Sequence, residues 1–439
     1  MKDVLSGILA ETTERFKVPG QSRAISLDPT KPKVQTIIGP RRAGKSSLLK
    51  LAIHKLLSEG IEWRQICYLP LEDERLRGET FKPDLILQAF GELYPENPGS
   101  EDVFFFFDEI QYLPQWEAFI NRVHEQVSRK VIITGSNSKT LHTEVASVLR
   151  GRALPLELLP LSFAEYLQFR NIPFKAYGTE KAVVLAAFND YLLWGGFPEV
   201  ALSEQGDRRP VLQEYFNTVL YRDIIDQQQP ANYSYLRYLF HRIAGNTGKN
   251  LALRKIFLEM KSRGYSVSLG SIYQMADLAE SVYLYKRISR FDHSLIKREN
   301  ADKKCYFIDN GMLHAIDGSF STNKGMLLEN LVFWQLYRMY GNIYTTDIYY
   351  YQDPSHECDF VLYKEGGHAL PIQVCLQMTE ESTRQRELKS LVKACKQTNS
   401  KKGIIITLEE EQSLVYQDIN VQMIAAWKWC AVPFDIFSI

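Results

Sequence analysis

Gly39-Pro-Arg-Arg-Ala-Gly-Lys-Ser46 is the stretch that decides the fold of this 439-residue chain. It directly follows the apolar segment 34–38 and opens a predicted helix over 45–58, so the spacing Gly-x4-Gly-Lys-Ser stands between a strand and a helix. In that position, the backbone N–H groups of the loop and of the helix N-terminus point at a polyphosphate. The sequence therefore predicts a phosphate-binding loop.

The residues of this loop have separate chemical tasks. Lys45 places a positive charge on the β- and γ-phosphates, and the Ser46 hydroxyl ligates Mg²⁺. The predicted cofactors are therefore ATP and Mg²⁺. The expected nucleotide-binding residues are Gly39, Pro40, Arg41, Arg42, Ala43, Gly44, Lys45, Ser46 and Ser47.

Two carboxylates end a second apolar segment, Phe104-Phe-Phe-Phe107-Asp108-Glu109. We expect Asp108 to hold Mg²⁺, directly or through water, and Glu109 to polarise the attacking water. An acidic residue after the aspartate indicates hydrolysis of ATP, whereas the alternative for this pair is a solvated turn. These residues predict an ATP hydrolase.

Polar and basic residues that follow the next strand, 130–135, complete the candidate site. Ser136 or Asn137 would hydrogen-bond the γ-phosphate or the lytic water, and the alternative is that they cap a helix. Arg150 or Arg152 would act as an arginine finger, either within the chain or from a second copy in a homo-oligomer. The alternative for these two arginines is an ordinary surface pair.

Short apolar segments without alternation are interleaved with helical patterns from about residue 33 to 136. Such segments are typical of strands buried on both faces, as in a parallel sheet. We therefore predict an α/β fold: a doubly wound P-loop NTPase domain in which the strand–helix unit 65–93 is inserted between the two motifs. After 301, strands mixed with two helices predict a further α/β domain.

These motifs resemble the prokaryotic AAA-type P-loop ATPases with a C-terminal domain of unknown function, near the archaeal ATPase group. The resemblance extends over nearly the whole chain and implies ATP binding and hydrolysis at Walker A and Walker B motifs, without implying a substrate. The matching segments are GPRRAGKSS (39–47), FFFFDEIQ (104–111), ITGSNS (133–138), LRGR (149–152), ELLPLSFAEYL (157–167), WGGFPEV (194–200), YRDI (221–224), CYFIDNGM (305–312), GMLLENLVF (325–333) and ECDFVL (357–362).

Residues 247–291 resemble the winged helix-turn-helix expected in this family. Helices over 250–263 and 268–279 would present Tyr273 and Gln274 to a DNA major groove. The alternative is a packing or protein-binding element, because the second helix carries few arginines. The basic residues around this segment are Lys286, Arg287, Arg290, Lys297, Arg298, Lys303 and Lys304.

The last segment resembles a restriction-endonuclease core, in which a helical Glu, a hairpin Asp and a Glu-x-Lys pair hold Mg²⁺ and activate water. Glu329 and Asp359 match the first two positions, but Gln373 and Cys375 replace the pair. Gln373 is a poor Mg²⁺ ligand and Cys375 lacks the cation of lysine. We therefore expect this fold without nuclease activity.

The predicted domains are 1–160 (P-loop ATPase), 161–232 (helical lid or linker), 233–300 (winged-helix-like) and 301–439 (nuclease-like). The 52 basic and 52 acidic side chains cancel, which argues against tight, indiscriminate DNA binding. No apolar segment reaches the roughly 18 residues that span a bilayer, and the six cysteines form no Cys-x-x-Cys pair. We expect a cytoplasmic protein with no membrane partner, whose partners beyond ATP are DNA, a second copy or another protein.

Overall fold

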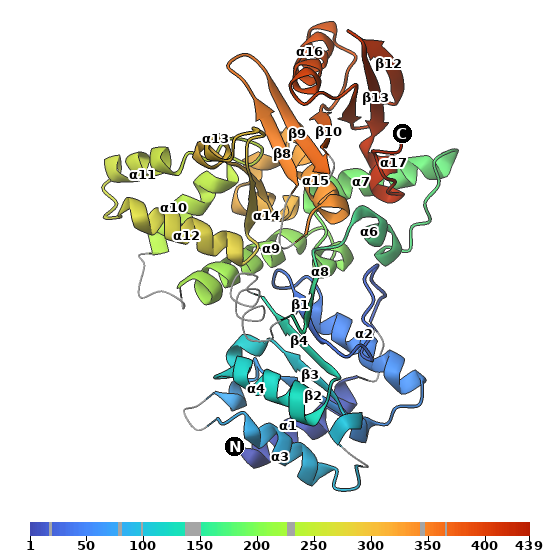
Figure 1. The fold of residues 1–439 in the computed structure, drawn as a ribbon, viewed down its shortest axis with the longest axis vertical. Helices are drawn as coiled ribbons and strands as arrows, with labels where there is room; N and C mark the ends of the chain where they lie inside the picture. The colour runs from blue at the N-terminus through green and yellow to red at the C-terminus, as the bar shows by residue number, and fades with distance from the viewer. Residues whose placement is uncertain are drawn as a thin grey trace. The chain divides into compact units, whose positions relative to one another are not determined.

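The computed structural model describes residues 1–16, 20–77, 81–97, 100–136, 151–225, 233–342, 347–364 and 367–439. The chain forms two compact units, Met1–Leu159 and Pro160–Ile439, which we call the N-terminal and C-terminal units (Figure 1). Among the described residues, no helix combines the length and the apolar character that a bilayer crossing requires.

One five-stranded parallel sheet forms the centre of the N-terminal unit, in the order β2-β3-β4-β1-β5. Strands β1, β3 and β4 are buried along their whole length, which explains why their sequences are mostly apolar. The predicted parallel α/β domain is confirmed, and β2 is the strand that the chain forms between the two motifs. The strands are β1 (Val34–Ile38), β2 (Ile66–Pro70), β3 (Phe104–Asp108), β4 (Val131–Gly135) and β5 (Ala153–Glu157).

Helix α2 packs one apolar face against this sheet. Leu49 and Ile53 of α2 are fully buried in the same core as Ile37 of β1 and Phe106 of β3. This packing fixes the N-terminus of α2 at the carboxyl edge of the sheet. The helices are α1 (Lys2–Arg15), α2 (Lys45–Ser58), α3 (Asp84–Leu93) and α4 (Trp116–Arg122), the last continued by a π-helical turn, Val123–Val127.

Helices form the first part of the C-terminal unit, followed by the antiparallel pair β6–β7. Ser268 caps α12, as the sequence predicted, because its hydroxyl accepts a hydrogen bond from the N–H of Ser271. The elements are α6 (Phe163–Phe169), α7 (Thr179–Trp194), α8 (Pro198–Leu202), α9 (Arg208–Thr218), α10 (Tyr233–Ala244), α11 (Leu253–Ser262), α12 (Leu269–Ser281), β6 (Tyr285–Ile288), α13 (Leu295–Asn300), β7 (Lys304–Phe307) and α14 (Asn310–Ile316).

A mixed six-stranded sheet, in the order β12-β13-β11-β10-β9-β8, forms the rest of this unit and confirms the predicted second α/β region. Strands β8, β9 and β10 are antiparallel, and β10, β11 and β13 are parallel. Helix α16 packs on β9, β10 and β11 (Figure 1). The elements are α15 (Lys324–Tyr340), β8 (Ile348–Gln352), β9 (Glu357–Lys364), β10 (His368–Val374), α16 (Glu381–Gln397), β11 (Lys402–Thr407), β12 (Gln412–Tyr416), β13 (Ile419–Ala425) and α17 (Ala426–Ala431).

Candidate functional site

The loop between β1 and α2 has two glycines that the backbone path requires. A Cβ on Gly39 would lie 2.1 Å from the carbonyl oxygen of Leu158, so a side chain is excluded there. Gly44, at the start of α2, has a left-handed φ of 100°, which favours glycine. The loop can therefore lie against the backbone at Leu158 and still lead directly into α2.

Lys45 is buried, with 3% of its side chain exposed. Its ammonium donates to the carbonyl oxygens of Gly39 and Pro40, each at 3.1 Å, and lies 3.3 Å from Oε1 of Glu109. These contacts hold the ammonium of Lys45 at the centre of the loop, where it would contact a bound polyphosphate. The arrangement of the loop and Lys45 fits a nucleoside triphosphate.

Asp108 ends β3 as a buried carboxylate with several donors. The hydroxyl of Thr134 donates to Oδ1 at 2.5 Å and that of Tyr68 to Oδ2 at 3.0 Å. Burial raises the pKa of Asp108 and the charge of Glu109 adds to this, whereas a hydrogen bond with Ser46 lowers it. Ser46 and Asp108 thus lie together, and a hydroxyl beside a carboxylate is an oxygen set that fits Mg²⁺.

Glu109 has a left-handed backbone conformation, with φ 54° and ψ 59°, which is uncommon for a residue with a side chain. Its Oε2 accepts a hydrogen bond from the Gln111 amide at 2.6 Å. Burial alone would raise the pKa of Glu109, but the charges of Lys45 and Arg41 outweigh it, so its pKa lies below the ordinary value. Glu109 is therefore held ionised and oriented, as an acceptor of a water proton must be.

Two further residues join this network, and sequence reasoning missed them. The Thr134 hydroxyl also accepts from the N–H of Glu109 at 2.9 Å, and the Gln111 amide reaches the hydroxyl of Ser136 at 3.3 Å. Thr134 is the polar residue inside the apolar strand next to β3, and this could have been the signal. Gln111 offered no such signal, because its contacts depend on the turn after β3.

The other loop contacts come from arginines. Arg23, which precedes β1, donates to the carbonyl oxygens of Ala43 at 2.7 Å and Leu159 at 2.9 Å. Arg41 donates to the Tyr112 hydroxyl at 3.0 Å. Arg23 thus braces the loop, and Arg41 brings a second positive charge to the same edge of the sheet.

The structure treats the remaining predicted residues differently. Ser136 lies in the network, whereas Asn137 and Arg150 lie outside the described residues. The carbonyl of Arg152 accepts from the N–H of Val34 at 3.0 Å, and its guanidinium contacts Glu125. Because Val34 begins β1, Arg152 lies at the sheet edge opposite the loop, and a finger role for it within one chain is disfavoured.

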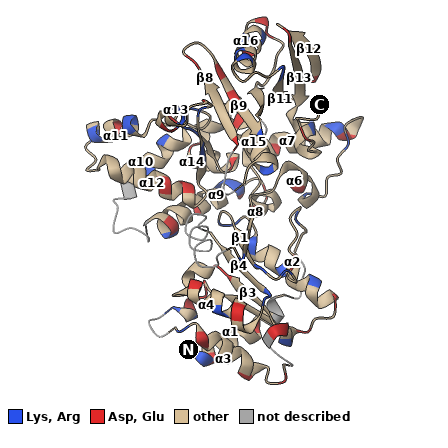
Figure 2. Cartoon of the chain, in the orientation of Figure 1, with Lys and Arg blue, Asp and Glu red and all other residues tan. Residues whose placement is uncertain are grey.

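Helix α12, the predicted DNA-contacting element, exposes Tyr273 but has no Lys or Arg in its sequence (Figure 2). Several of the neighbouring basic residues are engaged within the protein. Arg287 pairs with Asp277 and Glu280 of α12, and Arg298 donates to the Tyr349 hydroxyl at 3.2 Å. The predicted DNA contact stays a prediction.

In the predicted nuclease-like set, Glu329 of α15 and Asp359 of β9 converge on one point. Gln373 lies nearby, with its side-chain oxygen 3.4 Å from the N–H of Asp359. Cys375 makes a different contact, since its thiol donates to the carbonyl of Gln377. In place of the cation that Cys375 cannot supply, the ammonium of Lys304 contacts both carboxylates.

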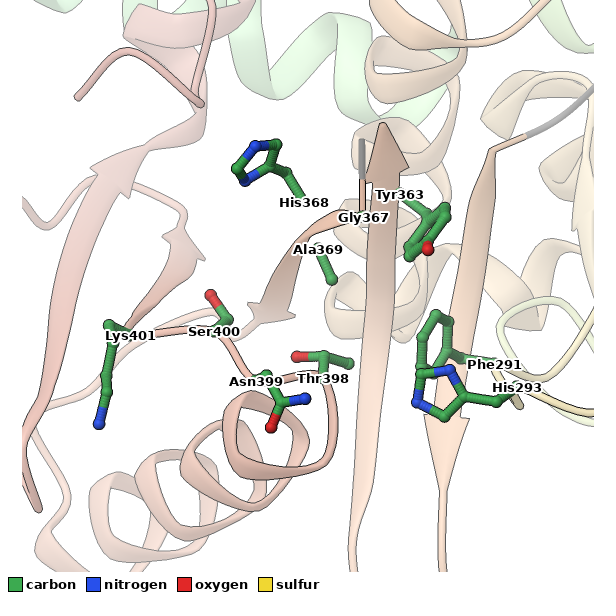
Figure 3. Close-up of a pocket in the computed structure, with 10 residues that line it drawn as sticks. All are labelled: Phe291, His293, Tyr363, Gly367, His368, Ala369, Thr398, Asn399, Ser400 and Lys401. Atoms are coloured by element: carbon green, nitrogen blue, oxygen red, sulfur yellow. The ribbon is translucent and has the colours of Figure 1, made fainter. Parts of the chain in front are cut away.

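A separate pocket of about 260 Å³ lies in the C-terminal unit (Figure 3). Its lining has no carboxylate, and its two histidines, His293 and His368, are exposed, so we assign it no ligand. The lining residues are Phe291, His293, Tyr363, Gly367, His368, Ala369, Thr398, Asn399, Ser400 and Lys401.

The sheet order and the loop geometry define an AAA-type P-loop ATPase-like nucleotide-binding domain. A family model described as "AAA domain" matches residues 31–167. Two models described as domains of unknown function, DUF8612 and DUF4143, match residues 185–323 and 324–428. The chain belongs to the family of proteins in which an AAA domain is followed by these two domains.

Relatives match most of the chain. The uncharacterized protein MJ1544 of Methanocaldococcus jannaschii is 31% identical over 435 residues, covering 95% of this chain and 92% of that protein. An uncharacterized protein of Haemophilus influenzae is 27% identical over 353 residues, 80% of this chain and 84% of its own. The solved structure of the Walker-type ATPase PABY2304 of Pyrococcus abyssi is similar over 72% of this chain and 95% of that chain, with 16% identity and a TM-score of 0.42.

Proposed function

We propose that this protein is a Mg²⁺-dependent ATP hydrolase that couples hydrolysis to a change in its C-terminal half. The observation that carries the proposal is the convergence of Lys45 and Ser46 with Asp108, the last residue of β3, and Glu109, which follows it. In this assignment, Lys45 binds the β- and γ-phosphates, and Ser46 and Asp108 hold Mg²⁺. The metal ion, when bound, supplies charge stabilisation of the phosphate oxygens.

Glu109 is the catalytic residue for the water. Its ionised carboxylate accepts a proton from the water as the water attacks the γ-phosphate. The bond between the γ-phosphorus and the oxygen that bridges it to the β-phosphate breaks, which releases ADP and phosphate. Gln111 and Thr134 are positioning residues, because they contact Glu109 and Asp108 and do not themselves contact phosphate in this assignment. Ser136 does not contact Glu109 directly in this network, because its hydroxyl accepts a hydrogen bond from Gln111, which also donates to Glu109.

The test is ATP turnover by the full chain with and without Mg²⁺. We expect Glu109→Gln to lower kcat by about 100-fold or more, while ATP binding is retained or becomes tighter. Lys45→Ala should lose binding and turnover together. The matched control is Lys55→Ala, an exposed lysine of the same helix that forms a surface pair with Glu59. Unchanged turnover in both site variants would refute the assignment.

Coupling to the C-terminal half has a separate readout. Hydrogen exchange of the full chain, measured with Mg²⁺ and a non-hydrolysable ATP analogue, should change protection in residues 160–439 as well as around the loop. The Lys45→Ala variant should lose both changes. A change of protection confined to residues 1–159 would refute the proposed coupling and leave the proposed ATP hydrolysis unaffected.

The arginine finger is proposed to come from a second copy, because Arg152 lies at the sheet edge opposite the loop of its own chain. Turnover per chain should then rise with protein concentration, and a mixture of inactive Arg152→Ala and Glu109→Gln chains should regain activity. If the mixture stays as inactive as its two components, Arg152 does not act from another copy.

Binding of DNA in a nucleotide-gated manner is the second proposal. It is favoured by the two-helix segment α11–α12, in which Ser268 caps the second helix and Tyr273 is exposed. The logarithm of affinity should fall with the logarithm of salt concentration, by about 0.9 per phosphate contacted on duplex DNA. Absence of binding at low salt, with and without ATP, would exclude it.

A further inference from the structure

Lys304 carries an ammonium group in the interior of the C-terminal unit, with 1% of its side chain exposed. Its nitrogen lies 3.4 Å from Oε1 of Glu329, 2.5 Å from Oε1 of Glu357 and 3.5 Å from Oδ1 of Asp359. One cation therefore contacts three carboxylates that come from a helix and from one strand.

Two of these carboxylates, Glu329 and Asp359, stand at the positions that the sequence matched to metal ligands of a nuclease-like core, and Glu357 lies beside them. Glu329 is the helical carboxylate, and Glu357 and Asp359 are two residues apart on β9, so they share a face of the strand. Protein groups also hold the carboxylates in place. The Tyr306 hydroxyl donates to Glu329 at 2.8 Å, and the N–H of Val374 donates to Asp359 at 2.9 Å.

The residues do not fit a divalent metal ion at this point. Such an ion needs several oxygens within about 2.1–2.6 Å of one centre, and here the ammonium of Lys304 lies at that centre. The third position of the core is the neutral Gln373, whose amide donates to Glu387 at 2.7 Å. Within the described ranges, no group of three or more His, Cys, Asp or Glu side chains has the arrangement of a metal site.

Electrostatics keeps Lys304 charged. Burial alone would lower the pKa of Lys304, but the charges of Glu329, Asp359 and Glu357 outweigh it, and the pKa lies above the ordinary value. Burial and the charge of Glu329 raise the pKa of Asp359 well above its ordinary value. Three carboxylates thus face one ammonium, and removal of Lys304 would remove the cation that contacts all three.

Backbone packing closes the cluster from another side. Gly248 lies against Glu329, so that a Cβ there would be 2.9 Å from its Oε2, and the N–H of Gly248 donates to the carbonyl of Cys305, next to Lys304. Lys304 belongs to β7, which follows the winged-helix-like segment, and its contacts join β7 to helix α15 and to β9 of the mixed sheet.

We propose that the ammonium of Lys304 is the resident cation of this nuclease-like core, bridging Glu329, Glu357 and Asp359 where nucleases of this fold hold a metal ion. The C-terminal domain therefore binds no divalent cation there and does not cut nucleic acid. Its carboxylates hold β7, α15 and β9 together, which goes beyond the ATPase proposal and does not depend on it.

The test is binding of Mn²⁺ to the full chain without nucleotide, by electron paramagnetic resonance and by thermal unfolding. Lys304→Met removes the charge and keeps the approximate length of the side chain, so it should bind one more Mn²⁺ per chain than the wild type, and Mn²⁺ should raise its Tm selectively. Lys304→Arg, which keeps the charge, should gain no site. The double variant Lys304→Met/Asp359→Asn should lose the gained site.

Either of two results would overturn the proposal. One is a folded Lys304→Met protein, verified by circular dichroism, that gains no Mn²⁺. The other needs no substitution of Lys304: Mn²⁺-dependent cleavage of DNA by the wild-type chain, abolished by Asp359→Ala. If Lys304→Met does not fold, two other results together support the proposal. The wild type should not cleave DNA, and Asp359→Asn should bind as much Mn²⁺ as the wild type.

Discussion

The ammonium of Lys45 lies 3.3 Å from Oε1 of Glu109, and this contact joins the phosphate-binding loop to the end of β3. Both side chains are buried, so each charge is partly neutralised by the other. A bound polyphosphate would compete with Glu109 for the same ammonium. The pair therefore links nucleotide binding to the position of the carboxylate proposed to orient the water.

Glu109→Gln should bind ATP more tightly than the wild type, because Lys45 no longer pairs with a carboxylate. The expected result is a larger rise of Tm on adding a fixed concentration of ATP and Mg²⁺, together with a lower Tm in their absence. Glu117→Gln on α4 is the control and should leave both values unchanged. A nucleotide-induced rise smaller than that of the wild type would contradict the competition.

Gln111→Ala should lower kcat by about tenfold and leave KM nearly unchanged, because it frees Oε2 of Glu109 without touching the loop. The pKa of Glu109, which the Gln111 hydrogen bond helps to lower, should move up, so the acid limb of the rate–pH profile should shift to higher pH. Gln115→Asn, an exposed amide a few residues away, should change neither. An unshifted acid limb would show that Gln111 does not act through Glu109.

Thr134→Val keeps the side-chain shape and removes the hydroxyl that contacts Asp108 and Glu109. We expect the free energy of unfolding to fall by about 1–3 kcal/mol, since two buried polar groups lose a partner. We also expect a higher Mg²⁺ concentration for half-maximal turnover. Urea unfolding and a Mg²⁺ titration measure these effects. Thr134→Ser should retain most of both properties, and equal losses in the two variants would contradict the role of the hydroxyl.

Asp309 predicts a pH dependence of stability. It accepts from the N–H groups of Gly196 at 2.7 Å and Gly311 at 2.8 Å, and burial raises its pKa from 3.8 to about 6. Because the folded protein then holds this proton more tightly than the unfolded chain, the contribution of Asp309 to the free energy of unfolding falls as pH rises from about 4 to about 6. The slope is about 1.4 kcal/mol per pH unit at most.

Asp309→Asn cannot ionise, so this part of the slope should vanish, whatever the variant loses in absolute stability. Urea unfolding at several pH values from 4 to 7 measures the difference. Asp418→Asn, an exposed residue, is the control and should keep the wild-type slope. If Asp309→Asn and the wild type have parallel profiles, the carboxyl of Asp309 does not titrate in this range.

Local sequence predicted the loop and the strands β1 to β4 of the N-terminal unit, but neither β5 nor the order of the strands in the sheet. The segments 34–38, 104–108 and 131–135 have mostly apolar sequences because both faces of these strands are buried. The nucleotide-binding loop was equally predictable. Its glycines, lysine and serine are neighbours in the chain, and their spacing alone determines how the backbone can turn around a phosphate.

Contacts between distant residues were not predictable in this way. Thr134 meets Asp108 because β4 lies beside β3 in a particular register, and Lys304 meets Glu329 and Asp359 because β7 packs against α15 and β9. The sequence suggested that Cys375 left the nuclease-like core without a cation. The fold supplies that cation from residue 304.

By itself, then, the sequence determined the chemistry that lies within one turn of backbone: the loop around Lys45, the carboxylates at the end of an apolar strand, and the α/β class. Only the tertiary structure decided which charged side chains meet, as Lys45 meets Glu109 and Lys304 meets its three carboxylates. The physical reason is that an ion pair forms over a few ångströms of space, and strand register and helix packing set that distance independently of separation along the chain.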